Sequence, residues 1–266
     1  MFASVAVNFI IAGTLVVAYQ GGTLRHYPVA PDRSLTSAVY IEKGLPANDR
    51  QWGGSDYKQA AAVLKTLMKT DPTLLPRYHS PASGAMFARI VSPENFARFR
   101  NETFPRQTRM TEASDMLSGV GQILIVYNSA MTETRLFDSE EVELFRYILE
   151  ISRDIMQLAD ARTGSRGAGS ADDLFIDRDQ MGRGLASIVS GSLRVFTEKN
   201  FFRPPELLRH ADTMEMILPE IFSFLPAGTQ LEINVRLQGM IKAETDPALR
   251  ERLTRIAAAL AKSRAG

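Results

Sequence analysis

Residues 138–161 constrain the fold more than any other part of the chain, because they predict a long helix that is apolar on two sides. Asp138 is suited to cap this helix, and Glu140 and Glu141 fall in its first turn, where the helix dipole favours negative charge. A helix with a wide apolar surface needs neighbours on both sides, so we expect this one at the centre of a helical bundle. Its two adjacent apolar stripes, spaced by three and four, are Leu144, Ile148, Ile151, Ile155 and Leu158, and Val142, Phe145, Leu149 and Met156.

Helical periodicity also covers most of the remaining chain. The last two helices are separated by a very short turn and should form an antiparallel hairpin, and Pro219 should kink the helix that contains it. Thr229 and Glu232 have the spacing of a capping box, which places a helix start at Thr229. The predicted helices outside residues 138–161 span residues 55–69, 86–91, 92–101, 177–199, 204–221, 229–244 and 246–260.

Two segments are ambiguous between helix and strand. Residues 122–127, QILIVY, have the composition of a buried strand, but apolar residues across 108–130 recur at steps of three and four. We therefore predict a helix there, in which Gly119 and Gly121 permit close packing against a neighbouring helix. Residues 37–41 are predicted as a short strand.

These patterns predict a mainly α protein, a bundle of seven or eight helices behind an N-terminal apolar segment. Residues 162–173, RTGSRGAGSADD, have the composition of a flexible linker and mark the best candidate boundary within the chain. The predicted organisation is an apolar segment at 1–24, a loop-rich arm at 25–54, helical subdomains at 55–161 and 174–266, and the linker between them.

The apolar segment at residues 1–24 contains no charged side chain, and the first charge is on Arg25. Its length suits an export signal, although no Lys or Arg precedes the apolar run. About 20 apolar residues also suffice for a retained membrane anchor, and a buried hairpin is a third alternative. We expect a protein of the cell envelope, periplasmic or extracytoplasmic, with contact to a membrane through residues 1–24 if they are retained.

Composition excludes several kinds of chemistry. The chain has no cysteine, which rules out thiolate catalysis, disulfides and cysteine-ligated zinc. A net charge of +1 provides no overall field that would attract nucleic acid, so a nucleic-acid partner is not expected. The three histidines lack the i, i+4 spacing of a helical metal site, and the familiar phosphate-binding and hydrolase motifs are missing. We predict neither a metal nor a cofactor.

Residues 77–84, RYHSPASG, form the segment with the most functional side chains. Arg77 and Tyr78 are candidate binding residues. His79, Ser80 and Ser83 are candidate catalytic residues, because serine and histidine can act together in acyl transfer, and His210 is a further candidate. The alternative is that the loop is ordinary and that the histidines are surface residues.

Three arginines, Arg98, Arg100 and Arg106, lie in a basic stretch with interleaved phenylalanines, which is typical of a surface that binds anions. The same pattern fits a core of phenylalanines with arginine on the solvated face. Trp52, beside two glycines, is a candidate exposed anchor for a partner, with a packed core position as the alternative.

The function we expect is that of a non-enzymatic, exported or membrane-anchored helical protein that binds another macromolecule, either a protein partner or a second copy of itself. One alternative is a hydrolase that uses the loop at residues 77–84. Another is a single-span accessory subunit of a membrane complex, which would expose apolar patches on the bundle.

Overall fold

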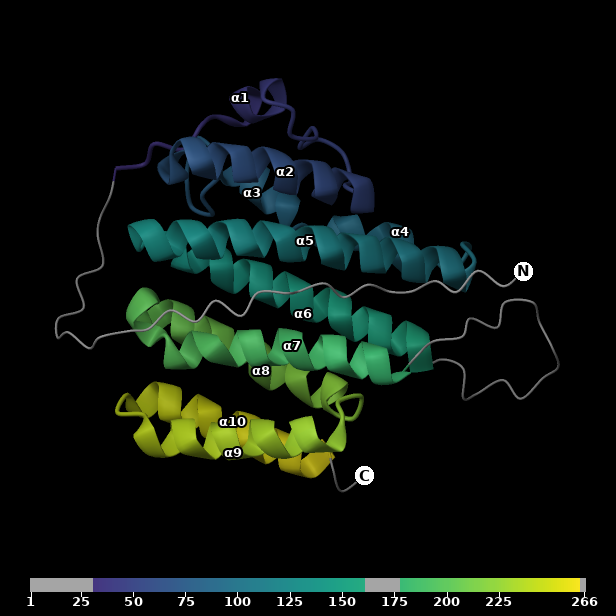
Figure 1. Ribbon diagram of the computed structural model, residues 1–266, viewed down its shortest axis with the longest axis vertical. Coiled ribbons are helices and arrows are strands. Elements are labelled where there is room, and N and C mark those ends of the chain that lie inside the picture. The colour runs from purple at the N-terminus through teal and green to yellow at the C-terminus, as the bar shows by residue number, and fades with distance from the viewer. Residues whose placement is uncertain (1–30, 161–177, 264–266) are drawn as a thin grey trace.

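The computed structural model describes residues 31–160 and 178–263, and all regular structure in these residues is helical. This confirms the mainly α class (Figure 1). The apolar segment 1–24 and the linker 162–173 lie outside the described residues. The helices are α1 (Ser37–Glu42), α2 (Gly54–Thr70), α3 (Gly84–Ile90), α4 (Ala97–Arg100), α5 (Arg106–Thr134), α6 (Asp138–Asp160), α7 (Arg178–Thr197), α8 (Pro204–Phe222), α9 (Ala227–Ala243) and α10 (Pro247–Ser263).

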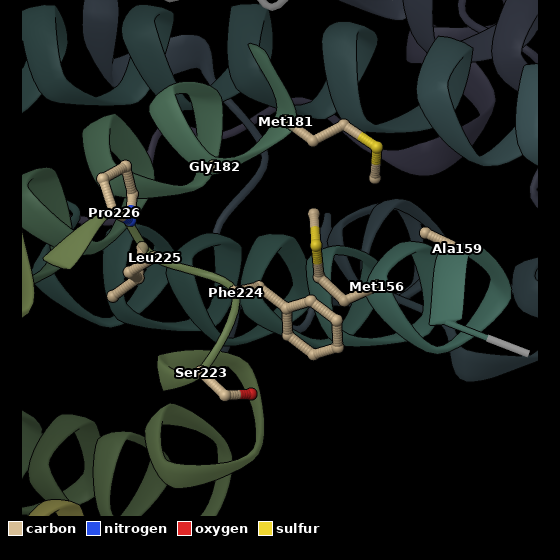
Figure 2. Close-up of a pocket in the computed structure, with 8 residues that line it drawn as sticks. All are labelled: Met156, Ala159, Met181, Gly182, Ser223, Phe224, Leu225 and Pro226. Carbon is tan, nitrogen blue, oxygen red and sulfur yellow. The ribbon is translucent and has the colours of Figure 1, made fainter. Parts of the chain in front are cut away.

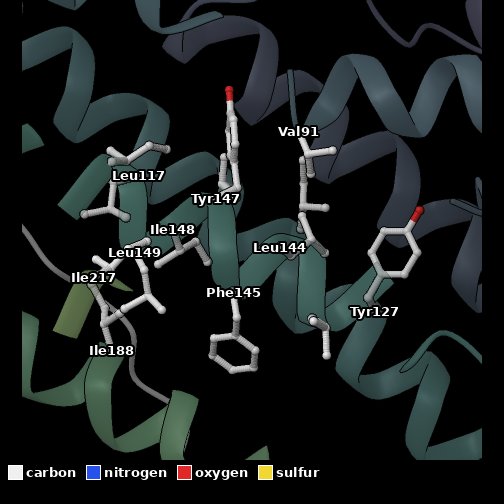
Figure 3. Packing of buried hydrophobic residues seen from close by; sticks show 14 of the residues in the cluster. Val91, Leu117, Tyr127, Leu144, Phe145, Tyr147, Ile148, Leu149, Ile188 and Ile217 are labelled. Atoms are coloured by element: carbon white, nitrogen blue, oxygen red, sulfur yellow. The ribbon is translucent and has the colours of Figure 1, made fainter. Parts of the chain in front are cut away.

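Helix α6 occupies the position that its two apolar stripes predict. It packs against α5 on one side and against α7 and α8 on the other (Figure 1). Leu144, Ile148, Ile151 and Ile155 are all buried, and only Leu158 near the end of the stripe is half-buried. Figure 3 shows Tyr147 and Phe145 extending in opposite directions from this helix, which is why it needs neighbours on two sides.

The ambiguous segments are resolved by the structure. Residues 108–130 lie within the single helix α5, so the helical period was the better guide there. The strand predicted at residues 37–41 is wrong, because Thr36 accepts a hydrogen bond from the amide of Val39 and begins the short helix α1. The start of α9 was also misplaced: the helix begins at Ala227, directly after Pro226. The amide of Gln230 donates to the carbonyl of Pro226 at 3.0 Å, so Thr229 already lies inside the helix and cannot be its cap.

Helices α2 and α5 approach each other closely where glycines remove side chains. A Cβ atom on Gly119 would lie 2.4 Å from Cβ of Tyr57, and one on Gly54 would lie 2.4 Å from Cβ of Asp115. Real side chains never come this close, so each helix places a glycine against the backbone region of the other. The predicted close packing at Gly119 is therefore confirmed.

Two buried tyrosines link these helices to α6. The hydroxyl groups of Tyr57 and Tyr147 are 2.8 Å apart, and they also bond the carbonyl oxygens of Ile90 and Ser92. The side-chain amide of Asn95 donates to the Tyr57 hydroxyl at 2.7 Å. Because a buried carbonyl without a partner is costly, this network fixes the turn between α3 and α4 against α2 and α6.

Candidate binding surface

The first two turns of α6 place four carboxylates inside the molecule. Asp138 forms hydrogen bonds of 2.7 and 2.9 Å with the guanidinium group of Arg203, at the residue that precedes α8. Glu143 pairs with Arg209 of α8 at 3.0 Å, and Arg209 also pairs with Glu206 at 2.5 Å. Burying these charges requires partners for each of them, so the arrangement joins α6 to α8 by ion pairs that tolerate little change.

Glu140 connects the same region to the loop at residues 77–84. Its carboxylate accepts a hydrogen bond from the backbone amide of Tyr78 at 2.5 Å. Burial raises the pKa of Glu140, and this hydrogen bond opposes the rise. The loop that the sequence singled out therefore lies against the start of α6.

Glu141 faces the interior beside α5. Burial raises the pKa of its carboxyl group to about 8, while hydrogen bonds from the side-chain amide of Asn128, at 3.2 and 3.4 Å, act in the opposite direction. Arg194 of α7 contributes a weaker attraction, and Glu198 and Asp138 contribute repulsion. Burial therefore favours the protonated, uncharged form of Glu141 at neutral pH.

The connection between α5 and α6 has an uncommon backbone. Arg135 ends α5 with φ of 58°, and Phe137 has φ of 76°. Left-handed backbone is uncommon for residues other than glycine and is an outlier for a bulky side chain such as phenylalanine. Phe137 is held in place by an edge-on contact with Tyr127, at 5.6 Å between ring centroids.

Three arginine–aromatic contacts gather around this connection. The guanidinium group of Arg77 lies 5.7 Å from the ring centroid of Phe137, that of Arg135 lies 5.1 Å from Phe201, and that of Arg209 lies 5.3 Å from Tyr78. Distances below 6 Å are attractive for a cation over a ring. We call this region the corner surface and define it as Arg77, Tyr78, His79, Arg135, Phe201 and Arg209, at the end of the molecule where α6 and α8 begin (Figure 1).

The candidate catalytic residues of the loop do not form a serine–histidine pair. His79 is exposed and packs on Tyr78, with ring centroids 4.3 Å apart. Ser83 is buried, and its hydroxyl donates to Ser34, which in turn donates to Asp32 at 2.6 Å. The Ser80 hydroxyl is 2.9 Å from that of Ser34 and accepts backbone amides within its own turn. These serines hold the loop to the preceding chain, and no hydrogen bond joins them to His79 among the described residues.

His210 lies in the core, away from any described cleft. Its Nε2 atom is 2.9 Å from the carbonyl oxygen of Ser192 and 3.0 Å from that residue's hydroxyl. When Nε2 donates its hydrogen to the carbonyl, it has no lone pair left to accept the proton of the Ser192 hydroxyl. His210 therefore does not activate Ser192 as a nucleophile. Burial lowers the pKa of His210 to about 4, partly opposed by the hydrogen bond to Ser192.

This depressed pKa makes the stability of the protein sensitive to acid. Above the unfolded pKa of about 6.5 both states are neutral at His210, but between pH 6.5 and 4 only the unfolded state gains the proton. Between pH 7 and 4 the wild-type protein should therefore lose about 3 kcal/mol more unfolding free energy than the His210→Gln variant. Unfolding free energies of both proteins at the two pH values measure this difference. The exposed His79→Gln variant should retain the wild-type slope, and an unchanged slope for His210→Gln would contradict the assignment.

The other candidate binding residues lie elsewhere and are largely occupied. Trp52 is buried and its indole N–H donates to the carbonyl of Ala47, so the prediction of an exposed anchor is wrong. Arg100 pairs with Asp154 at 2.6 Å, and Arg106 donates to the carbonyl of Ala159. Arg98 is exposed on α4, where its charge helps to lower the pKa of Asp56. Among the predicted binding residues, Arg77 and Tyr78 are the ones that the structure places in a shared surface with further cations and aromatics.

A small apolar pocket lies at the opposite end of α6 from the corner surface. Its volume is about 190 Å³, and Figure 2 shows two methionine side chains and Phe224 around it. The lining supplies no acid or base for chemistry. It is formed by Met156, Ala159, Met181, Gly182, Ser223, Phe224, Leu225 and Pro226.

The described residues contain no group of three histidine or carboxylate side chains placed to hold a metal ion. None of the described helices is both long enough and apolar enough to span a bilayer. No protein-family model, curated protein or solved structure matches the chain.

Sequence patterns missed Arg135, Phe201 and Arg209 of the corner surface. Arg135 carries no local signal, because arginine is an unusual residue for a left-handed helix end. Arg209 and Phe201 meet residues more than 60 positions earlier in the chain, and such contacts follow from the packing of α6 on α8. The one available signal was the concentration of Arg and Phe residues around 194–203.

Proposed function

We propose that this protein is a non-enzymatic helical module of the cell envelope that binds another macromolecule through the corner surface. The observation that supports this most is the gathering of three arginine–aromatic contacts around a connection with two left-handed residues. Arginine and tyrosine are enriched among the residues that dominate protein interfaces. Left-handed conformations of such side chains are concentrated at functional sites, where the surrounding structure holds them.

The absence of a catalytic arrangement among the described residues is consistent with a binding role. His79 and His210 lie in different environments, and neither activates a serine. The assignment to the envelope rests on the uncharged apolar run of residues 1–24.

Both parts of the proposal can be tested on the full chain in its own cells. A photo-reactive phenylalanine analogue at position 79, in the corner surface, should give a discrete cross-linked product, whereas the same analogue at exposed Thr254 of α10 should not. The intact mass of the purified protein should show that the apolar segment has been removed. If the segment is retained, fractionation of the cells should place the protein in the membrane. Absence of a product specific to position 79 would refute the binding surface, and a full-length protein free of the membrane would refute the envelope assignment.

A single-span subunit of a membrane complex is the second candidate, because α9 exposes two large apolar side chains on its outer face. Ile233 and Leu237 are buried, yet Leu231 and Val235 on the outer face are 60% and 64% exposed. Exposed apolar patches on a folded protein often mark a contact with another protein or a membrane. Retention of residues 1–24, together with cross-links from α9 to another membrane subunit, would favour this function.

A further inference from the structure

The arginines around the start of α6 fall into two groups. Arg203 and Arg209 use their guanidinium donors inside the protein, in bonds to Asp138, Ser139, Glu143 and Glu206. These two therefore stabilise the fold and offer few donors to a partner.

Arg77 and Arg135 differ in a way that matters for binding. Each lies over an aromatic ring, Phe137 or Phe201, which occupies the face of the guanidinium group. Neither side chain forms a hydrogen bond or ion pair with another described residue, so their N–H donors are not committed inside the described protein, although the charge of Arg77 also acts on the carboxyl groups of Asp32 and Glu140. Stacking also restricts the side chain, so less conformational entropy is lost when an acceptor binds.

The two guanidinium groups belong to the same small region. Arg77 contacts Phe137, which is only two residues along the chain from Arg135. Arg135 is exposed and Arg77 is half-buried, so both edges can be reached from solvent. Tyr78 and His79, whose tilted rings contact each other beside Arg77, extend the surface with aromatic area.

The electrostatic surroundings favour a short acidic peptide over a nucleic acid or an anionic membrane. Asp138, Glu140, Glu143 and Glu206 lie beneath the surface, and the net charge of the whole chain is only +1. Nucleic acids and anionic membranes are attracted by dense positive fields, such as clusters of four or more cations without intervening acids. Two fixed guanidinium forks instead match separate carboxylates, which they can bind in a bidentate manner.

We infer that the corner surface binds an acidic segment of a partner protein, with Arg77 and Arg135 each receiving a carboxylate and Tyr78 and His79 packing against the segment between them. This inference rests on the proposed function and adds the chemistry of the partner.

The test uses the full chain and a fluorescein-labelled hexaglutamate peptide, with binding followed by fluorescence anisotropy at low and high salt. We expect saturable binding that the Arg77→Gln/Arg135→Gln variant weakens about tenfold, because two charge-assisted contacts are lost. The control variant Lys65→Gln/Arg183→Gln removes the same charge from exposed positions on α2 and α7 and should bind within about twofold of wild type. Added salt should weaken wild-type binding more than that of the corner variant.

A second variant guards against a folding defect. Arg135→Gly keeps a residue that favours the left-handed conformation while removing the guanidinium group, so it should fold and still lose affinity. The inference is overturned if hexaglutamate does not bind, if both charge variants lose affinity equally, or if phosphatidylglycerol vesicles bind through Arg77 and Arg135 while the peptide does not. If the peptide fails but cross-linking from position 79 persists, the binding function stands and only the acidic partner is rejected.

Discussion

Replacing Gly119 by alanine is expected to lower the free energy of unfolding by about 3 kcal/mol, one of the two largest effects we anticipate. The added Cβ would lie 2.4 Å from Cβ of Tyr57 and 3.0 Å from its carbonyl carbon. Neither atom can rotate away, so α2 and α5 must separate along their contact. The separation would also disturb the hydroxyl of Tyr57, which bonds Tyr147 and Ile90. Urea denaturation, with the midpoint and slope compared with wild type, measures the effect.

Gly239 provides the matched control on α9. A Cβ there would have nothing within 4 Å, so alanine should stabilise the helix by about 0.5–1 kcal/mol through its higher propensity. If both glycine variants changed stability by the same amount, the close approach of α2 and α5 would be wrong.

Replacing Glu141 by glutamine is expected to remove the loss of stability that Glu141 itself causes between pH 4.5 and 8. Burial holds the carboxyl group protonated in the folded state up to a pKa of about 8, whereas in the unfolded state it ionises near 4.5. Below pH 4.5 both states carry the proton, so the wild-type protein has no penalty there. As pH rises towards 8 only the unfolded state is ionised, and the wild type loses about 4 kcal/mol relative to the variant.

The measurement is the unfolding free energy of wild type and Glu141→Gln at several values between pH 4.5 and 9. Glu102→Gln, at an exposed position, serves as the control and should follow the wild-type curve. Parallel curves for wild type and Glu141→Gln would show that Glu141 is ionised in the folded protein.

The sequence predicted the parts of this fold that depend on one helix at a time. The stripe from Leu144 to Ile155 located the central helix, because a period of 3.6 residues is visible without knowing the neighbours. Gly119 was identified for the same reason. His210 could have been assigned to the core, since it falls on the stripe of Leu207, Ala211 and Met214.

The candidate surface was only partly predictable. Arg77 and Tyr78 attracted attention through their local composition, but their contacts come from Phe137 and Arg209, which are distant in sequence. The loop serines were candidates to pair with a histidine. Instead Ser83 donates to Ser34, which donates to Asp32, and both of these residues lie in the loop-rich arm. Hydrogen bonds between two loops form only when the packed helices bring the loops together. The periodicity of the sequence does not predict this packing.

The tyrosine network affects how the chain folds during translation. The Ser92 carbonyl accepts a local hydrogen bond from the amide of Asn95, but its second hydrogen bond comes from Tyr147, 55 residues later. The hydroxyl of Tyr57 meets the same residue across 90 positions. A nascent chain that has not yet released α6 from the ribosome therefore lacks the hydrogen bonds that Tyr147 supplies to this carbonyl and this hydroxyl. Truncation anywhere before Tyr147 should leave the segment after α3 open to proteases, however well α2 and α5 have already assembled.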